Sequence, residues 1–362
     1  MRACTRNSRS STAIAGIFGA LRTSKQKLTD QRILFLGGGS AAPGIAELIS
    51  EAMSFEGFTM EQGRARNGLF GIDGLMVSSR TDVGDFQRPF AHKHAPMGTF
   101  LEAIEAIRPT CIIGVSTVPK LFGQPVIEAM LRPNERPNIF PYSNPTSRPE
   151  CTAEEAYKWS NSWAIFASGT PFPPVEFGGG TFVPGQGNNV YIFPAMGMAV
   201  LATEAKRVTQ SMFICAAKSV AAQVTDEDLA SGLTYPPQSR ILDASLNTAT
   251  RLAELVFDSR LAAVPQPANV GEYVRAAVYR PVYRAELWGD FLPGPRPPSG
   301  SRSARRRDRR RTRRERARPS RGIVRYPRRP RSPALLSQGL GPPRRLPAGR
   351  WSHSRASGSR YR

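Results

Sequence analysis

A run of three glycines near the start of the chain could bind a phosphate group. Residues 37–42 (G-G-G-S-A-A) match the pattern G-x-G-x-x-A, in which the first glycine permits a tight turn and the second lets backbone N–H groups approach a pyrophosphate. The third position must be small for helix–strand packing, and Ala42 meets that need. Because the start of a helix attracts negative charge, this segment is a candidate dinucleotide-binding turn.

An acidic residue is expected at the end of the second strand of such a fold, where it holds the hydroxyl groups of the adenosine ribose. Asp73 ends the run L-F-G-I-D and is the candidate. It lies 36 positions after Gly37, whereas the usual spacing is roughly 20. The first helix and its loop must therefore be long. The alternative is that Asp73 is a turn residue before Gly74 without a ligand.

Two strings of side-chain amides could contact a polar ligand. Asn188 and Asn189 follow a glycine turn in P-G-Q-G-N-N, and Asn144 lies in S-N-P-T, just beyond an apolar run. Adjacent amides are awkward in a regular element but suit a loop that presents them to a ligand. Ligands also bind beyond the carboxyl ends of strands in open α/β sheets. The alternative for each string is an Asx turn that serves only the structure.

The elements around these motifs alternate between strands and helices. Short apolar runs, typical of strands buried on both faces, occupy 32–36, 69–72, 111–115, 139–142 and 165–167. Helical spacing covers 12–29, 41–54, 99–107, 124–131, 208–223 and 241–258. This alternation predicts an α/β fold with a Rossmann-type, doubly wound, mostly parallel sheet and extra helices toward the C-terminus.

The charge of the chain is concentrated near its C-terminus. The net charge is +22, but residues 291–362 contain 23 arginines, no lysine and only two acids, a net of +21. The preceding 290 residues therefore carry a net charge of +1. The C-terminal segment consists mostly of Arg, Pro, Ser and Gly, and it cannot bury enough apolar surface to offset its chain entropy. We therefore expect residues 286–362 to be a disordered basic tail.

Other features of the composition exclude several classes of protein. The four cysteines form no C-x-x-C pair and only three histidines occur, which argues against a zinc site and a disulfide scaffold. No run approaches about 18 apolar residues, so we expect no transmembrane helix. The first ten residues are rich in Arg and Ser, and no acid precedes Asp30. This composition is typical of a transit peptide and slightly favours a mitochondrial over a cytoplasmic location, the alternative being a random or truncated start.

Several strings taken together resemble the malic enzyme family, whose members oxidise L-malate with NAD(P) and decarboxylate it to pyruvate. The resemblance is collinear from about residue 12 to about residue 284. The strings are R-I-L-F-L-G-G-G-S-A-A-P-G-I-A, F-A-H-K-H, N-E-R-P-N-I-F-P-Y-S-N-P-T-S, E-C-T-A-E-E-A-Y, A-I-F-A-S-G-T-P-F, F-V-P-G-Q-G-N-N-V-Y-I-F-P and L-T-Y-P-P. The resemblance implies an NAD(P)-binding domain over residues 12–285, after a remnant or transit-like start (1–11) and before the tail (286–362).

The resemblance also implies a role for each candidate residue. It assigns cofactor binding to Gly37, Gly39, Ser40, Ala41, Asp73 and Asn189, and binding of malate to Asn144 and Asn188.

Two departures from the family pattern concern the cofactor. Gln87 occupies a place where NADP-preferring members tend to have lysine, and a neutral amide offers no charge to a 2′-phosphate. We therefore expect NAD to be favoured over NADP, unless Gln87 is a solvated surface residue. Pro119 and Lys120 stand where the family usually has glycine-rich sequence, and we expect them to crowd the cofactor.

The chemistry implied by the resemblance needs a base, an acid and a divalent cation such as Mn²⁺ or Mg²⁺. In the family the Tyr, the Lys, a substrate-binding Arg and the three carboxylate metal ligands lie upstream of the dinucleotide domain. One carboxylate comes from a D-D-I-Q-G-T-like string directly before the small-residue helix, where this chain has C-T-R-N-S-R-S-S-T. A hard cation needs oxygen ligands, preferably anionic. We therefore expect no catalytic residue and no metal ligand here, and predict that this chain alone does not turn over malate.

Other interpretations stay open. A natural protein that includes the upstream half would be active and would form the homo-oligomers that the family implies. A non-enzymatic alternative is a dinucleotide-binding module whose basic tail binds nucleic acid or an acidic partner through nonspecific contacts. A different hydride-transfer enzyme on the same fold is a further alternative, against which both amide strings argue. The strict absence of lysine from the tail also fits translation in a wrong frame.

Overall fold

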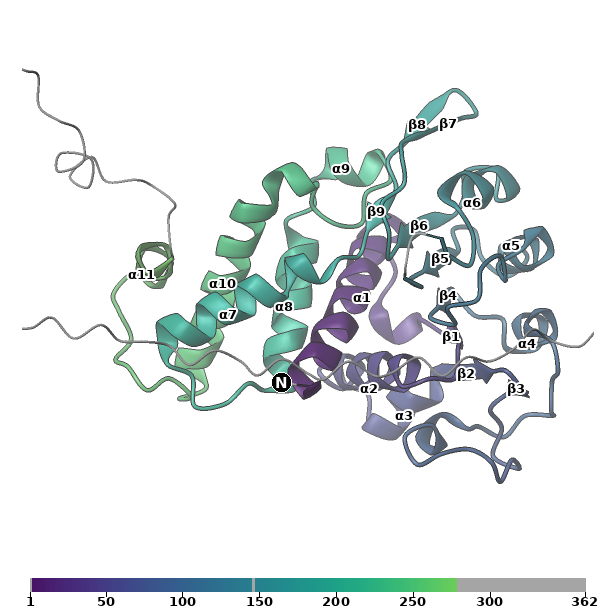
Figure 1. Cartoon of the computed structure of the whole chain (residues 1–362), viewed down its shortest axis with the longest axis horizontal. Coiled ribbons are helices and arrows are strands. Elements are labelled where there is room, and N and C mark those ends of the chain that lie inside the picture. The colour runs from purple at the N-terminus through teal and green to yellow at the C-terminus, as the bar shows by residue number, and fades with distance from the viewer. Residues whose placement is uncertain (1, 145–146, 279–362) are drawn as a thin grey trace, which may run out of the picture. The chain divides into compact units, whose positions relative to one another are not determined.

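The computed structural model of the chain describes residues 2–144 and 147–278 (Figure 1). The predicted basic tail at 286–362 lies outside these residues, and the boundaries proposed at 12 and 285 stay predictions.

Helix α1 (Arg2–Ser24) opens the fold and runs through the predicted boundary between residues 11 and 12. Ser11 is buried in this helix and donates a hydrogen bond to the carbonyl oxygen of Phe213, 2.6 Å away. The helix ends earlier than the predicted residue 29, because Lys25 takes a left-handed conformation with a φ of 56°. Residues just before position 12 therefore belong to a packed helix.

A seven-stranded sheet lies at the centre of the described chain and confirms the predicted Rossmann-type fold. Its strand order is β3-β2-β1-β4-β5-β6-β9, and the pairs are parallel except that β3 runs antiparallel to β2. The strands are β1 (Ile33–Leu36), β2 (Asn67–Gly71), β3 (Gly74–Leu75), β4 (Cys111–Gly114), β5 (Asn138–Pro141), β6 (Ile165–Ser168) and β9 (Gly185–Gln186). From β1 the chain adds strands first on one side (β2, β3) and then on the other (β4, β5, β6), so the strand order reverses between β1 and β4. Open α/β sheets bind ligands at this switch point.

The carboxyl ends of the central strands meet at one edge of this sheet. Leu36, the last residue of β1, pairs with Phe70 of β2 and with Gly114 of β4. Gly114 in turn pairs with Pro141 of β5. The glycine turn follows β1, and the amide string S-N-P-T follows β5. The register therefore brings both motifs to the same edge.

Helices cover both faces of the sheet (Figure 1). The residues of β1 alternate between two cores, with Ile33 and Phe35 in one and Leu34 and Leu36 in the other, as the period of a strand requires. The first core is built by α1, α2 (Ala41–Ser54), α8 (Gln210–Ala222), α7 (Phe193–Thr203), α10 (Ile241–Asp258) and α11 (Val270–Ala277). The second core is built by α4 (Phe100–Ile107), α5 (Gln124–Leu131) and α6 (Ala153–Trp159).

The predicted strands and the helices after the first strand are confirmed, with ends displaced by at most two residues. The short helices α3 (Met60–Ala65) and α9 (Asp226–Ala230) were not expected. Neither was a separate hairpin formed by β7 (Val175–Phe177) and β8 (Gly180–Phe182), whose turn places Gly178 and Gly179 at φ values of 60° and 79°. Two successive positive φ values are what a two-residue hairpin turn needs. Among the described residues, no helix is both long and apolar enough to cross a membrane.

Candidate functional site

The glycine turn lies directly after β1. Gly37 has a φ of 124° and donates its N–H to the carbonyl oxygen of Phe70, 2.8 Å away. A Cβ added to Gly37 would lie 2.7 Å from the backbone of Val115, so this position accepts only glycine. A Cβ added to Gly39 would meet nothing within 4 Å. The turn therefore leaves open space in front of Gly39, at the start of α2, where a pyrophosphate fits.

This open space is part of a cleft of about 920 Å³. Small-molecule and cofactor sites span about 300–1,000 Å³, so the cleft has room for one nucleotide half of a dinucleotide. Its lining brings the glycine turn together with the end of β2, the loop after it and the loop after β4. The lining residues include Leu36, Gly37, Gly38, Gly39, Ser40, Ala41, Phe70, Asp73, Arg80, Asp82, Gln87, Ser116, Thr117, Val118 and Leu121. The cleft thus contains every predicted cofactor residue except Asn189.

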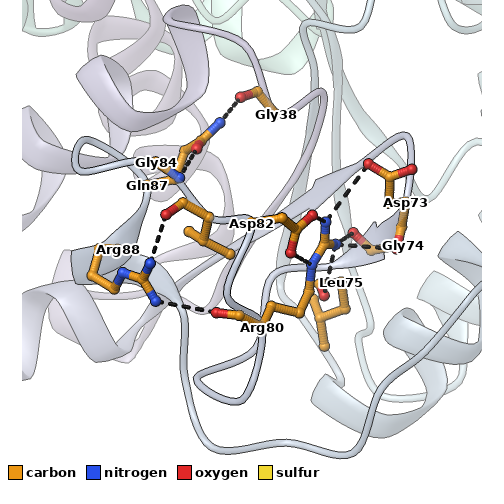
Figure 2. Close-up of polar contacts among 10 residues, drawn as sticks. Gly38, Asp73, Gly74, Leu75, Arg80, Asp82, Gly84, Gln87 and Arg88 are labelled. Carbon is orange, nitrogen blue, oxygen red and sulfur yellow. Dashed lines mark hydrogen bonds and ion pairs between the residues drawn. The ribbon is translucent and has the colours of Figure 1, made fainter.

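Asp73 lies in the turn between β2 and β3, beside Arg80 (Figure 2). Its carboxylate is 71% exposed and its Oδ2 atom lies 3.6 Å from the guanidinium of Arg80. Arg80 also donates to the Asp73 carbonyl oxygen, 3.1 Å away, and makes two bonds with Asp82. The side-chain hydrogen bond from Arg80 lowers the pKa of Asp82. Asp73 is therefore both the turn residue of the alternative interpretation and an accessible carboxylate in the cleft. Arg80, which holds it in place, was not predicted from the sequence.

Gln87 lies at the edge of the same cleft and is not a free surface residue (Figure 2). Its amide nitrogen donates to the carbonyl oxygen of Gly38, 2.5 Å away, and its oxygen accepts from the N–H of Gly84, 2.8 Å away. The side chain therefore joins the glycine turn to the loop that follows β3. The interpretation of Gln87 as merely solvated is wrong, because both ends of its amide are bonded.

A smaller cleft of about 330 Å³ adjoins the first and contains the predicted amides. The two clefts share Ala41, Val115 and Thr117 in their linings. The smaller one is lined further by Thr12, Ala13, Ile45, Tyr142, Ser143, Asn144, Gly169, Gly187, Asn188 and Asn189. The structure therefore brings together, in two adjoining clefts, all eight residues that were predicted to bind the cofactor or malate.

The three amides differ in how they are held. Asn144 is exposed at the rim of the smaller cleft. The side-chain oxygen of Asn188 accepts from the N–H of Val190, 3.0 Å away, which is the Asx turn of the alternative interpretation. This bond occupies only the oxygen, and no described residue bonds the Asn188 amide nitrogen. Asn189 lies 3.4 Å from the hydroxyl of Thr12 in α1.

Two tyrosines connect the smaller cleft to helix α1. The hydroxyl groups of Tyr142 and Tyr235 are 2.6 Å apart, and Tyr235 donates to the carbonyl oxygen of Thr12, 2.8 Å away. Burial, together with the neighbouring Tyr235, raises the pKa of Tyr142 well above its usual value. Tyr142 therefore stays protonated at neutral pH and holds α1 against the cleft.

Glu150 is a second residue that sequence reasoning missed. It is fully buried, and its Oε1 atom accepts from Ser143 Oγ at 2.5 Å and from the N–H and Oγ of Ser116 at 3.1 and 2.9 Å. Ser116 follows β4 and Ser143 follows β5. The Glu150 carboxylate therefore joins the loop after β4 to the loop after β5. Its presence in the string E-C-T-A-E-E-A-Y was the available signal.

The expected crowding by Pro119 and Lys120 is wrong. The ammonium of Lys120 forms an ion pair with Glu155 at the start of α6, and neither residue lines the cleft. Their neighbours Val118 and Leu121 line it instead, with apolar side chains that are 51% and 40% exposed. This wall is suited to the flat face of an aromatic ring.

The described residues of the site do not provide a cluster of ligands for the divalent cation. Within residues 2–144 and 147–278, no three His, Cys, Asp or Glu side chains are close enough to hold a metal ion. The cradle at Gly39 and the exposed Asp73 carboxylate fit a dinucleotide, whereas the part of the chain that the structure describes does not fit the cation.

Comparison with known proteins gives a family and several relatives. A family model for the malic enzyme NAD-binding domain matches residues 7–257. An NADP-dependent malic enzyme from Vitis vinifera is 47% identical over 278 residues, which cover 76% of this chain and 47% of that protein. A chloroplastic NADP-dependent malic enzyme from Oryza sativa subsp. japonica is 43% identical over 278 residues, or 76% of this chain and 44% of that protein. The chain thus spans about half the length of the curated relatives it matches.

Solved structures match the fold. The malic enzyme of Entamoeba histolytica superposes with a TM-score of 0.60 at 22% identity, covering 79% of this chain and 55% of the other. The malic enzyme of Pyrococcus horikoshii gives a TM-score of 0.58 at 21% identity, covering 79% and 60%. At these identities the superpositions support the arrangement of strands and helices only.

Proposed function

This chain belongs to the malic enzyme family, and we propose that it supplies the dinucleotide-binding half of an enzyme that oxidises L-malate with NAD(P) and decarboxylates it to pyruvate. The observation that carries this proposal is the junction of the two clefts at the carboxyl edge of the sheet. One cleft has the glycine cradle and the other has the amides, and they meet at Ala41 and Val115. A nicotinamide ring bound at the junction would lie next to a substrate in the smaller cleft.

The residues of this chain bind and orient the two reactants. Backbone N–H groups at the start of α2 would hold the pyrophosphate of a bound dinucleotide, and the Asp73 carboxylate would accept hydrogen bonds from its ribose. The amide nitrogen of Asn188, which no described residue bonds, would donate to a carboxylate oxygen of malate, and Asn144 lies at the rim of the same cleft. A bound dinucleotide supplies the hydride acceptor. Holding both reactants in one geometry is itself a large part of the catalytic effect.

The proton of the malate hydroxyl must go to a base outside the smaller cleft. Among the described residues that line this cleft, Tyr142 is the only one that titrates. Burial raises its pKa, so it cannot accept the proton at neutral pH. The base and the cation therefore belong, in this proposal, to the half of the family's length that this chain does not span.

Charge in the larger cleft supports NAD as the preferred cofactor. Its ionisable lining residues are Asp73, Asp82 and Arg80, which together carry a net charge of −1. A 2′-phosphate brings further negative charge toward this wall, and Gln87 is neutral and already bonded at both ends. The names of the plant relatives make NADP the competing candidate. The ratio of the two dissociation constants decides between them.

Substitution at Gly39 tests the cofactor site. In Gly39→Ala the new methyl group fills the cradle without touching the protein, so we expect NADH affinity to fall by on the order of tenfold with no change in melting temperature. Gly98→Ala is the matched control, because its Cβ also meets nothing within 4 Å and it lines neither cleft. Fluorescence titration with NADH measures both. Equal affinities in the two variants would overturn the assignment of the cradle.

A turnover assay tests the division of labour. We expect the 362-residue chain to bind NAD but to show no malate-dependent reduction of NAD when Mn²⁺ is present. A metal-dependent rate from this polypeptide alone would show that its own residues supply base and cation site. Binding of NAD without turnover agrees with the proposal.

Location and assembly are further parts of the proposal. The Arg/Ser-rich start supports import into mitochondria, although chloroplastic forms occur among the relatives. A fluorescent fusion to the chain, imaged against a mitochondrial dye, tests this. Homo-oligomers are tested by the mass of the chain in solution.

A further inference from the structure

A third hollow lies at the amino end of strand β6, opposite the carboxyl ends of the strands where the two clefts lie. It has a volume of about 250 Å³ and includes Ile165, the first residue of β6, whereas the smaller cleft includes Gly169, just after the same strand. The strand therefore separates the two sites. The walls come from the end of α1, the loop before β5, helix α6, strand β8 and helix α9.

Two polar groups at this hollow have no hydrogen-bond partner among residues 2–144 and 147–278. Tyr157 is 1% exposed, yet its hydroxyl makes no hydrogen bond with any described residue. The Nε atom of Arg136 is likewise buried and unbonded. Buried polar groups are almost always paired because leaving them unpaired is costly. Both residues line the same hollow, which indicates that a ligand completes their bonding.

The charge of the hollow is positive. Arg22 is engaged, since it donates to the carbonyl oxygens of Ala221 and Val224 at 2.8 and 2.5 Å and pairs with Asp226 at 3.3 Å. Arg136 forms no ion pair with a described residue, so its guanidinium charge is uncompensated. Burial raises the pKa of Tyr157, which keeps its phenol protonated as a donor. The hollow therefore presents hydrogen-bond donors and one net positive charge.

We propose that this hollow binds a small organic carboxylate, with the carboxylate on Arg136 and the Tyr157 hydroxyl. The planar guanidinium donates two parallel bonds to a carboxylate. The apolar side chains of Ile165, Phe182 and Leu229 line the remainder and fit a short hydrocarbon body better than they fit an inorganic anion. The volume is below that of sites for drug-sized ligands, which restricts the ligand to a few carbon atoms.

Calorimetric titration of the full chain with succinate tests this site, and inorganic phosphate is the comparison anion. We expect saturable one-to-one binding of succinate and weaker binding of phosphate. Arg136→Gln should weaken succinate binding by about tenfold or more, because a charge-assisted pair is lost. Arg132→Gln is the matched control. Arg132 lies four residues before Arg136, its side chain is 67% exposed, and the substitution removes the same charge. All variants keep the same arginine-rich tail, so its nonspecific binding cancels.

Two further variants separate binding from folding. Tyr157→Phe removes a hydroxyl that bonds no described residue, so affinity for succinate should fall by about threefold to tenfold while the melting temperature does not fall. Asp226→Asn removes the acid of the hollow and should tighten binding, a direction that unfolding cannot produce. No saturable binding to the wild type, tighter binding of phosphate, or equal binding by the Arg136 and Arg132 variants would each overturn the proposal.

Discussion

The side-chain amide of Gln87 is hydrogen-bonded at both its nitrogen and its oxygen. Its amide links the carbonyl oxygen of Gly38 to the N–H of Gly84, so it fixes the glycine turn against the loop after β3 (Figure 2). The same bonds prevent it from turning toward a ligand. Arg80, the one cationic residue among the described residues that line the cleft, is already paired with Asp82 and Asp73. The proposed selectivity against a 2′-phosphate therefore rests on how the charges of this wall are paired.

Replacing Gln87 with lysine should move the preference toward NADP. Gln87→Lys adds one positive charge and brings the net charge of the ionisable lining from −1 to zero. We expect the affinity for NADP relative to NAD to rise by about tenfold, which is about 1.4 kcal/mol. Lysine cannot accept from Gly84, so stability should fall by about 1 kcal/mol. Titrations with NADH and NADPH, together with thermal melts, measure both effects.

Gln87→Met is the control for this change, because it has a similar length, also loses the bond from Gly84 and adds no charge. An equal change in the ratio of affinities in both variants would mean that the hydrogen bonds of Gln87, rather than charge, decide the preference.

Residues with roles near their own motif could be predicted from the sequence, and residues that act across long separations could not. The glycine turn and the three amides are recognisable because a short string defines each. Glu150 bonds Ser116, which lies 34 positions away, and Tyr235 reaches Thr12 over 223 positions. Only the folded arrangement shows that these pairs exist. The same holds for Arg136 and Tyr157, whose lack of partners is a property of the packed structure.

At the scale of elements, continuous apolar runs predicted the central strands well, because both faces of those strands are buried. The strands that were missed have a different origin. β3 and β9 contain two residues each, and they are strands only because β2 and β6 pair with them. The hairpin β7–β8 has no buried residue and carries no apolar run. Such elements depend on tertiary pairing or turn geometry rather than on a periodic pattern.

Glycines inside helices show how packing decides the effect of one methyl group. A Cβ on Gly19 of α1 would lie 2.2 Å from the carbonyl oxygen of Thr234, so this glycine lets the helix approach a neighbouring segment closely. A Cβ on Gly197 of α7 would meet nothing within 4 Å, and the position is exposed. The first glycine is needed for contact, whereas the second only adds flexibility to its helix.

Alanine at these two positions should therefore have opposite effects. Gly197→Ala should raise the free energy of unfolding by about 0.5–1 kcal/mol, because glycine in a helix interior costs backbone entropy. Gly19→Ala should lower it by about 1–3 kcal/mol through overpacking against a rigid carbonyl. Chemical denaturation followed by circular dichroism measures both. A loss of stability in both variants would mean that the exposed side of α7 is covered in solution.

At the scale of the whole molecule, charge and binding geometry lie in different parts of the sequence. The three hollows are lined by residues between Thr12 and Gly232. The first 290 residues carry a net charge of only +1, and residues 291–362 carry +21. Phosphate polymers bind arginine-rich segments through charge and release of counterions. A dinucleotide instead needs the shaped cleft, so the two kinds of binding should separate when the chain is cut.

Deletion of residues 291–362 should abolish retention on heparin and binding to duplex DNA, while the dissociation constant for NADH stays unchanged. The reason is that a nearly neutral body offers no field to a polyanion, whereas the cleft keeps all of its lining. A full-length variant with glutamine at every arginine of 291–362 is the control for length, and it should behave like the deletion. Binding to DNA by the intact chain should weaken steeply with salt. Heparin retention by the truncated chain would place a polyanion site on the body itself, and a weakened NADH affinity would mean that the arginines contribute to the cleft.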